Sequence, residues 1–188
     1  MRLNKIFARH LFWLLIVSLL PAFWLWGSTG ARNAQTARFP AIQATSLDNA
    51  RLHLPQDFSG QLNLVVVSFA REQQHDVDSW IPAAREIQTK HPKFSYYELP
   101  TMSSENLLYR WWFDTALRNN TNDHDLRNRI LTAYVNKHKF LKALGIANEK
   151  QVVAVLVDRT GKIYWRADGD CTEEDKLGLM QALAANQM

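Results

Sequence analysis

The feature that most restricts the fold of this chain is a nearly continuous apolar run over residues 62–69, which reads LNLVVVSF. Its β-branched residues are typical of a strand that is buried on both faces of a sheet. Apolar residues at helical spacing follow, in a helix that Asp76 or Asp78 can cap and that ends near Lys90. Residues 94–99 then alternate as a second strand. A strand, a helix and a strand in this order predict a βαβ unit with a right-handed crossover.

The remaining pattern extends this unit into an α/β fold. Residues 104–144 show apolar side chains at helical spacing with one polar break, which predicts a long helical region. Residues 151–157 and 162–167 flank a turn and predict a hairpin, and a terminal helix follows Thr172. We therefore predict a mixed sheet flanked by helices, with a helical insertion over residues 103–145.

The amino-terminal segment is predicted to be an export or membrane signal. Residues 11–26 carry no charge and follow the basic residues Arg2, Lys5 and Arg9. The apolar stretch of a cleaved signal peptide runs about 7 to 15 residues and a membrane anchor needs about 17 to 25, so the length leaves both alternatives open. Tryptophan at the far end favours an anchor, whereas small residues at 28–30 offer a cleavage site. In both cases the positive-inside rule places the body across the membrane.

We expect a leader at residues 1–27, a linker at 28–38 and a folded domain at 39–188.

The net positive charge of the chain comes largely from the leader. The formal charge of +4 comes from 22 basic and 18 acidic residues. Removing the three basic residues of the leader leaves 19 against 18, so the body is almost neutral. Nucleic acid is therefore not an expected partner.

Several local strings of the body resemble the thioredoxin-like superfamily, in its peroxiredoxin and extracytoplasmic thiol-reductase forms. They are Phe39-Pro40, Leu54-Pro55, residues 64–69 as the strand that leads to the active site, and residues 155–163 as the late hairpin. The resemblance covers roughly residues 39–186 and implies a thioredoxin-like sheet.

The residues that carry the chemistry of that superfamily are missing. Where the family has a CxxC motif or a peroxidatic cysteine, this chain has Gln73, Gln74 and His75 in a degenerate redox-motif position. Where the family has a cis-proline before the late strand, this chain has EKQV at residues 149–152. These two losses favour a protein that is not a redox enzyme.

Within the superfamily, the chain resembles the mitochondrial ATP synthase assembly-factor family, ATPase complex subunit ten, and its bacterial relatives. The strings that carry this likeness are residues 74–80, 97–100, 106–118, 134–145 and 163–167. The resemblance implies a thioredoxin-like protein at an inner membrane. Such a protein assists assembly of the proton-channel sector and catalyses no reaction.

Tyr109, Trp111 and Trp112 are candidate partner-binding residues. Neighbouring residues on a helix cannot both face the core, so one of the two tryptophans is expected at a surface. The alternative is that all three side chains pack against other helices.

The remaining reactive groups indicate little chemistry. Cys171 is the only cysteine, which excludes an intramolecular disulfide, and the acidic residues around it disfavour a thiolate. Two strings of histidine and aspartate, at residues 75–78 and 123–125, are interpreted as a helix start and a solvated helix break, because neither has the spaced ligands of a zinc site. We predict no catalytic residue, no metal site and no cofactor.

These observations predict a membrane-tethered, non-catalytic thioredoxin-like protein that binds, chaperones or assembles a membrane complex or its subunits. The membrane contact is residues 11–26. The domain is expected in the periplasm at the inner membrane, secreted there if the leader is cleaved, or at the mitochondrial inner membrane of a eukaryote. One alternative is an extracytoplasmic thiol peroxidase or reductase that uses Cys171 through intermolecular disulfides. Another is a metal or haem chaperone of the respiratory membrane.

Overall fold

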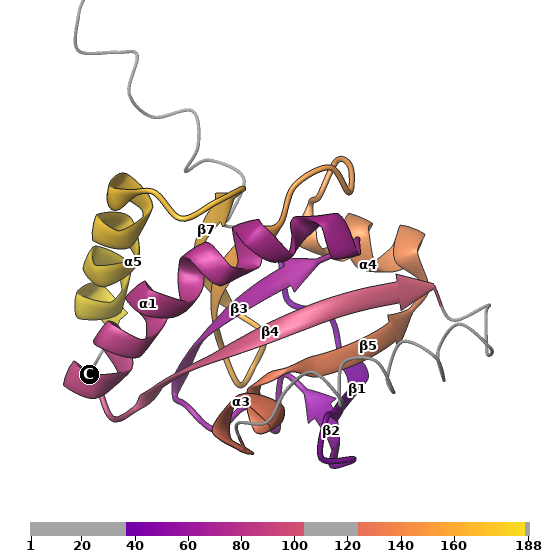
Figure 1. The fold of residues 1–188 in the computed structure, drawn as a ribbon, viewed down its shortest axis with the longest axis horizontal. Coiled ribbons are helices and arrows are strands. Elements are labelled where there is room, and N and C mark those ends of the chain that lie inside the picture. Colours follow the sequence, from indigo (N-terminus) through magenta and orange to yellow (C-terminus); the bar gives the residue numbers. More distant parts are fainter. Residues whose placement is uncertain (1–36, 104–123, 187–188) are drawn as a thin grey trace, which may run out of the picture. The chain divides into compact units, whose positions relative to one another are not determined.

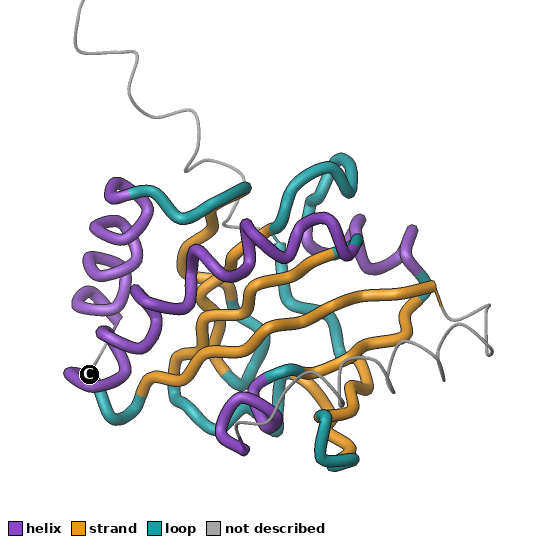
Figure 2. The backbone as a smooth tube through the Cα atoms, in the orientation of Figure 1, coloured by secondary structure: helices purple, strands orange, loops and turns teal. Residues whose placement is uncertain are grey.

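The computed structural model describes residues 37–103 and 124–186, and in these residues seven strands form one mixed sheet (Figures 1 and 2). The strand order is β2-β1-β5-β4-β3-β6-β7. The strands are β1 (Ile42–Ser46), β2 (Arg51–Leu54), β3 (Leu62–Ser68), β4 (Phe94–Ser103), β5 (Leu131–Val135), β6 (Val153–Asp158) and β7 (Ile163–Asp168).

The centre of the sheet is parallel and its flanks are antiparallel. β4 pairs in parallel with β3 on one side and with β5 on the other, so the carboxyl ends of these three strands lie at one edge. β6 runs antiparallel to β3 and begins at that same edge, and β7 and β1 add antiparallel pairs further out. This edge, which we call the carboxyl edge, is where the loops after β3 and before β6 meet.

Helices cover both faces of the sheet. They are η2 (Arg71–Gln73), α1 (Gln74–Lys90), α3 (His124–Arg129), α4 (Lys137–Leu144) and α5 (Glu173–Asn186). α1 and α5 share one core with the sheet, in which Trp80 and Leu179 are fully buried, and they lie next to each other in Figure 1. α4 packs on the opposite face, where Phe140 joins a second core with Phe39. None of the helices in the described part of the chain is long and apolar enough to cross a membrane.

The α/β fold with a mixed sheet and the βαβ unit are confirmed. Strand β3, helix α1 and strand β4 follow one another, and the run that begins at Leu62 is buried along almost its whole length. The late hairpin of β6 and β7 and the terminal helix α5 also form as predicted. The helix cap was misplaced: α1 begins at Gln74, so Asp76 lies in its first turn and does not cap it.

The prediction of a long helical region over 104–144, interrupted by one polar break, is wrong at residues 131–135. These residues form β5, between the short helices α3 and α4. Ala133 and Tyr134 continue a helical spacing from Ile130, but Leu131, Ala133 and Val135 alternate as in a strand; β5 pairs with β1 on one side and β4 on the other and buries Leu131 and Ala133 completely. Tertiary pairing on both sides overrides the local helical pattern. Residues 104–123, with Tyr109, Trp111 and Trp112, lie outside the described residues, as do the leader and most of the linker.

Candidate functional site

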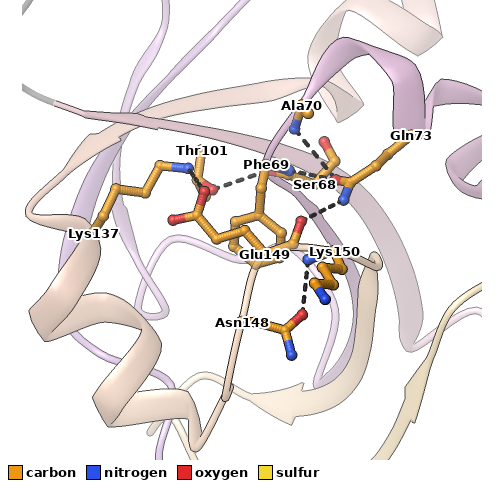
Figure 3. A network of polar contacts seen from close by, with 9 residues as sticks. All are labelled: Ser68, Phe69, Ala70, Gln73, Thr101, Lys137, Asn148, Glu149 and Lys150. Atoms are coloured by element: carbon orange, nitrogen blue, oxygen red, sulfur yellow. Dashed lines mark hydrogen bonds and ion pairs between the residues drawn. The ribbon is translucent and has the colours of Figure 1, made fainter.

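The Gln73 side chain lies at the carboxyl edge, in the degenerate redox-motif position (Figure 3). β3 ends at Ser68 and η2 turns the chain into α1, which leaves Gln73 only 7% exposed. Gln73 Oε1 accepts hydrogen bonds from the Phe69 N–H at 2.8 Å and from the Ala70 N–H at 3.3 Å. Its Nε2 atom donates to the Glu149 carbonyl oxygen at 2.8 Å. One amide therefore joins the loop after β3 to the loop before β6.

Glu149 continues these contacts to α4. Its Oε2 atom lies 2.9 Å from Lys137 Nζ. Lys137 Nζ is also 5.1 Å from the centroid of the Phe69 ring, within the range of a cation–π interaction. We call Gln73, Phe69, Ala70, Glu149 and Lys137 the Gln73 network. It holds together three segments that are distant in the sequence.

The backbone around the Gln73 network is also satisfied within the protein. The Thr101 hydroxyl on β4 donates to the Ser68 carbonyl oxygen at 2.9 Å, and the Asn148 side chain accepts from the Lys150 N–H at 3.0 Å (Figure 3). These contacts are mostly part-buried, and a polar network whose members are paired favours one local conformation. The carboxyl edge is therefore preorganised.

Gln74 and His75 are placed differently from Gln73. Both are exposed at the start of α1, and Gln74 Nε2 donates to Asp78 Oδ1 at 2.9 Å. Of the three residues in the degenerate redox-motif position, only Gln73 is built into the network. The other two side chains are accessible at its rim.

Glu98 is a buried acidic residue on β4 that the sequence pattern did not single out. It is 8% exposed and pairs in register with Val66 of β3. Burial, followed by the nearby carboxylate of Asp78, raises the pKa of Glu98 to about 7, although Gln74 and Arg85 act in the opposite direction. The alternation of β4 places Glu98 on the same face as the buried Tyr96, which is the signal that could have identified it.

Cys171 lies in the connection between β7 and α5. Its N–H donates to the Ser79 hydroxyl at 2.8 Å, and its thiol is half-buried. Burial raises the pKa of this thiol, and Asp175 and Glu173 raise it further. Because the thiolate is the nucleophile, this environment disfavours the peroxidase or reductase alternative.

The polar groups of the Gln73 network serve contacts inside the protein. The network contains no thiol, and its amide and carboxylate are engaged with partners inside the protein. Among the residues that the structure describes, no three His, Cys, Asp or Glu side chains are grouped as metal ligands. The pairing of Lys137 with Glu149 has no local sequence signal, because it depends on how β5 and β6 lie in the sheet.

The fold and the site together define a thioredoxin-like protein without a redox motif. The chain is similar to the exposed lipoprotein thioredoxin Etrx1 of Streptococcus pneumoniae, with a TM-score of 0.53 and 13% identity over 78% of this chain and 99% of that one. It is similar to a putative electron transfer protein from Aquifex aeolicus, with a TM-score of 0.57 and 12% identity over 81% and 97%. It is also similar to BsSco, of the Sco family of cytochrome c oxidase assembly proteins, with a TM-score of 0.57 and 11% identity over 81% and 95%. At these identities the likeness shows the fold alone.

The family of the chain is given by its sequence. The model of the ATP10 protein family matches residues 28–185, and the chain belongs to this family. The resemblance to the ATP synthase assembly factors is thereby confirmed. No curated protein matches the chain.

Proposed function

We propose that this protein is a membrane-tethered, non-catalytic assembly factor. It binds a subunit of a membrane complex, and that complex is ATP synthase. Residues 11–26 are the tether. The domain works on the far side of the membrane from the basic amino terminus, in the periplasm of a bacterium or at the inner membrane of a mitochondrion. Membership of the ATP10 family supports the choice of complex.

The observation that carries this proposal is the Gln73 network. The Gln73 amide occupies the position that the reactive thiol has in thioredoxin-like redox proteins. It donates a hydrogen bond to the Glu149 carbonyl oxygen in the loop before β6. A rigid edge without a nucleophile suits binding, because little conformational entropy is lost when a partner docks on it. The exposed side chains of Gln74, His75 and Asn148 surround the network and are available to a partner.

Photo-crosslinking in the native membrane tests this proposal. A crosslinking amino acid replaces Ala147, which is exposed beside the Gln73 network, and a control crosslinker replaces Gln61, which is exposed before β3 at the opposite edge of the sheet. We expect position 147 to capture a subunit of the ATP synthase membrane sector and position 61 to capture none. Equal capture from both positions, or capture of no such subunit, would contradict the proposal.

The aromatic residues Tyr109, Trp111 and Trp112 stay candidates for the same partner. Alanine at Trp111 and at Trp112, each in a separate variant, should reduce the crosslink from position 147 in one of the two variants. Thermal unfolding separates the two roles, because loss of a core-facing tryptophan destabilises the fold, whereas loss of a surface tryptophan lowers the crosslink alone.

A further inference from the structure

Helix α4 and the loop after it expose basic side chains that no acidic residue balances. His138, Lys139, Lys142 and Lys150 are exposed, and we call them the α4 basic patch. The only acidic residue between positions 136 and 150 is Glu149, whose carboxylate is already paired with Lys137. Within the described ranges, the three lysines of the patch form no ion pair.

The patch lies on one side of the helix. At 100° per residue, His138, Lys139 and Lys142 fall within an arc of about 100°, and Phe140 and Leu144 fall on the opposite side. Both of these apolar residues are buried against the sheet. The side chains of His138, Lys139 and Lys142 therefore point away from the domain on one side of α4, and Lys150 is exposed in the loop that follows.

The helix itself accounts for only part of this charge. Residues 137–139 place three basic side chains in the first turn of α4, where the partial positive charge of the helix amino terminus disfavours cations. α5 follows the usual rule, with Glu173, Glu174 and Asp175 in its first turn. Lys137 gains Glu149 as an internal partner, and Lys142 lies in the last turn, where cations are favoured, so Lys139 is the lysine of α4 for which the fold itself provides no compensation.

The buried side of α4, opposite the patch, packs on Phe39, close to the first described residue of the domain. The Phe39 ring packs edge-on against the Phe140 ring of α4, with centroids 6.4 Å apart, and the Phe39 N–H donates to the Gly161 carbonyl oxygen. Residues 27–38 connect Phe39 to the apolar run, and twelve residues span at most about 40 Å. A membrane that holds the apolar run is therefore within reach of α4.

We propose that the α4 basic patch docks on the anionic phospholipid surface of the membrane that holds residues 11–26. This inference rests on the tether of the proposed function. Lysine ammonium groups attract lipid phosphates, and each lysine near an anionic surface strengthens the contact by about fivefold. Docking would turn the carboxyl edge, which α4 borders, toward a subunit in the same membrane.

Fluorescence quenching with the full-length chain tests this inference. A fluorophore is attached to Ala143→Cys beside the patch, in a Cys171→Ser background, and the chain is reconstituted into vesicles with nitroxide-labelled headgroups. The vesicles contain phosphatidylcholine alone or an equal mixture with phosphatidylglycerol. A control fluorophore is attached to Thr89→Cys, which is exposed on α1 on the opposite face of the sheet.

We expect quenching at position 143 only in the anionic vesicles, lost in high salt, and no quenching at position 89. The Lys139→Glu/Lys142→Glu variant should reduce the docking equilibrium by about 30-fold or more, whereas Arg51→Glu/Lys93→Glu, with the same change in net charge, should leave it unchanged. Thermal unfolding verifies that both variants are folded.

Three results would overturn the inference. Quenching at position 143 that does not depend on lipid charge shows that the patch is not electrostatically docked. If position 143 is not quenched although the chain stays with the vesicles after a high-salt wash, docking is contradicted and the tether is supported. If the Lys139→Glu/Lys142→Glu variant then still loses assembly activity, the patch binds an acidic protein segment. Release of the wild-type chain by that wash contradicts the tether, and the inference falls with it.

Discussion

Gln73 is the residue on which the local structure of the carboxyl edge depends. Replacing it with alanine leaves the Phe69 and Ala70 N–H groups and the Glu149 carbonyl oxygen without their shared partner. Each unpaired buried group costs about 1 to 3 kcal/mol, and water relieves part of this cost. We expect Gln73→Ala to lower the free energy of unfolding by about 2 to 4 kcal/mol in urea denaturation, with the exposed Gln61→Ala near neutral. A loss no larger than the control's would show that the network is not rigid.

Glu98 makes stability depend on pH. Its pKa is 4.5 in ordinary surroundings and about 7 in the fold, so between these values the folded state holds a proton that the unfolded state has lost. The contribution of Glu98 to the free energy of unfolding is therefore greatest below about pH 4.5. It falls as the pH rises and becomes constant above about pH 7. The shift corresponds to at most roughly 3 kcal/mol.

Glu98→Gln tests this account because glutamine stays neutral at every pH. The variant should be more stable than the wild type at pH 8 by up to roughly 3 kcal/mol and similar to it at pH 4.5, in urea denaturation at both values. A constant difference between the two proteins across this range would contradict the raised pKa.

Cys171 is expected to be a slow nucleophile. Because burial and the carboxylates of Asp175 and Glu173 raise the pKa of its thiol, little thiolate is present at neutral pH. We expect iodoacetamide to alkylate folded Cys171 at pH 7 more slowly than it alkylates free cysteine. Faster alkylation than free cysteine would revive the enzyme alternative.

Strand β5 is a segment in which tertiary pairing, and not the local helical pattern, decides the secondary structure. Ile130, Ala133 and Tyr134 fit a helical spacing, whereas Leu131, Ala133 and Val135 alternate as in a strand, and pairing with β1 and β4 selects the strand. β3 was predictable because its β-branched run fits one structure far better than the other. Gln73 could be placed by the resemblance to thioredoxin-like proteins, but its bond to Glu149, 76 residues away, could not.

Thr132 allows a direct test of β5. Its hydroxyl oxygen is buried and has no hydrogen-bond partner in the part of the chain that the structure describes. Thr132→Val keeps the shape, suits a strand and removes the unpaired oxygen, so we expect it to be neutral or to stabilise the protein by about 1 kcal/mol. Destabilisation by more than about 1 kcal/mol in thermal unfolding would contradict this environment.

The protein as a whole combines a fold used for thiol chemistry with a site that lacks a thiol. The single cysteine lies after β7, outside the Gln73 network, and its surroundings disfavour the thiolate. Basic residues gather without neighbouring acidic residues in the leader, and α4 carries three lysines of which only Lys137 is paired with a carboxylate. On our proposal both face the same membrane, the first as a topology signal and the second as a docking surface.

The amount of assembled ATP synthase in the native host tests the central claim most directly. Cells that lack this protein are supplied with the wild type, Cys171→Ser or Gln73→Ala, and the assembled complex is measured on native gels. A non-catalytic assembly factor predicts wild-type amounts with Cys171→Ser and a clear loss with Gln73→Ala. Loss of the complex with Cys171→Ser, together with full assembly with Gln73→Ala, would contradict it.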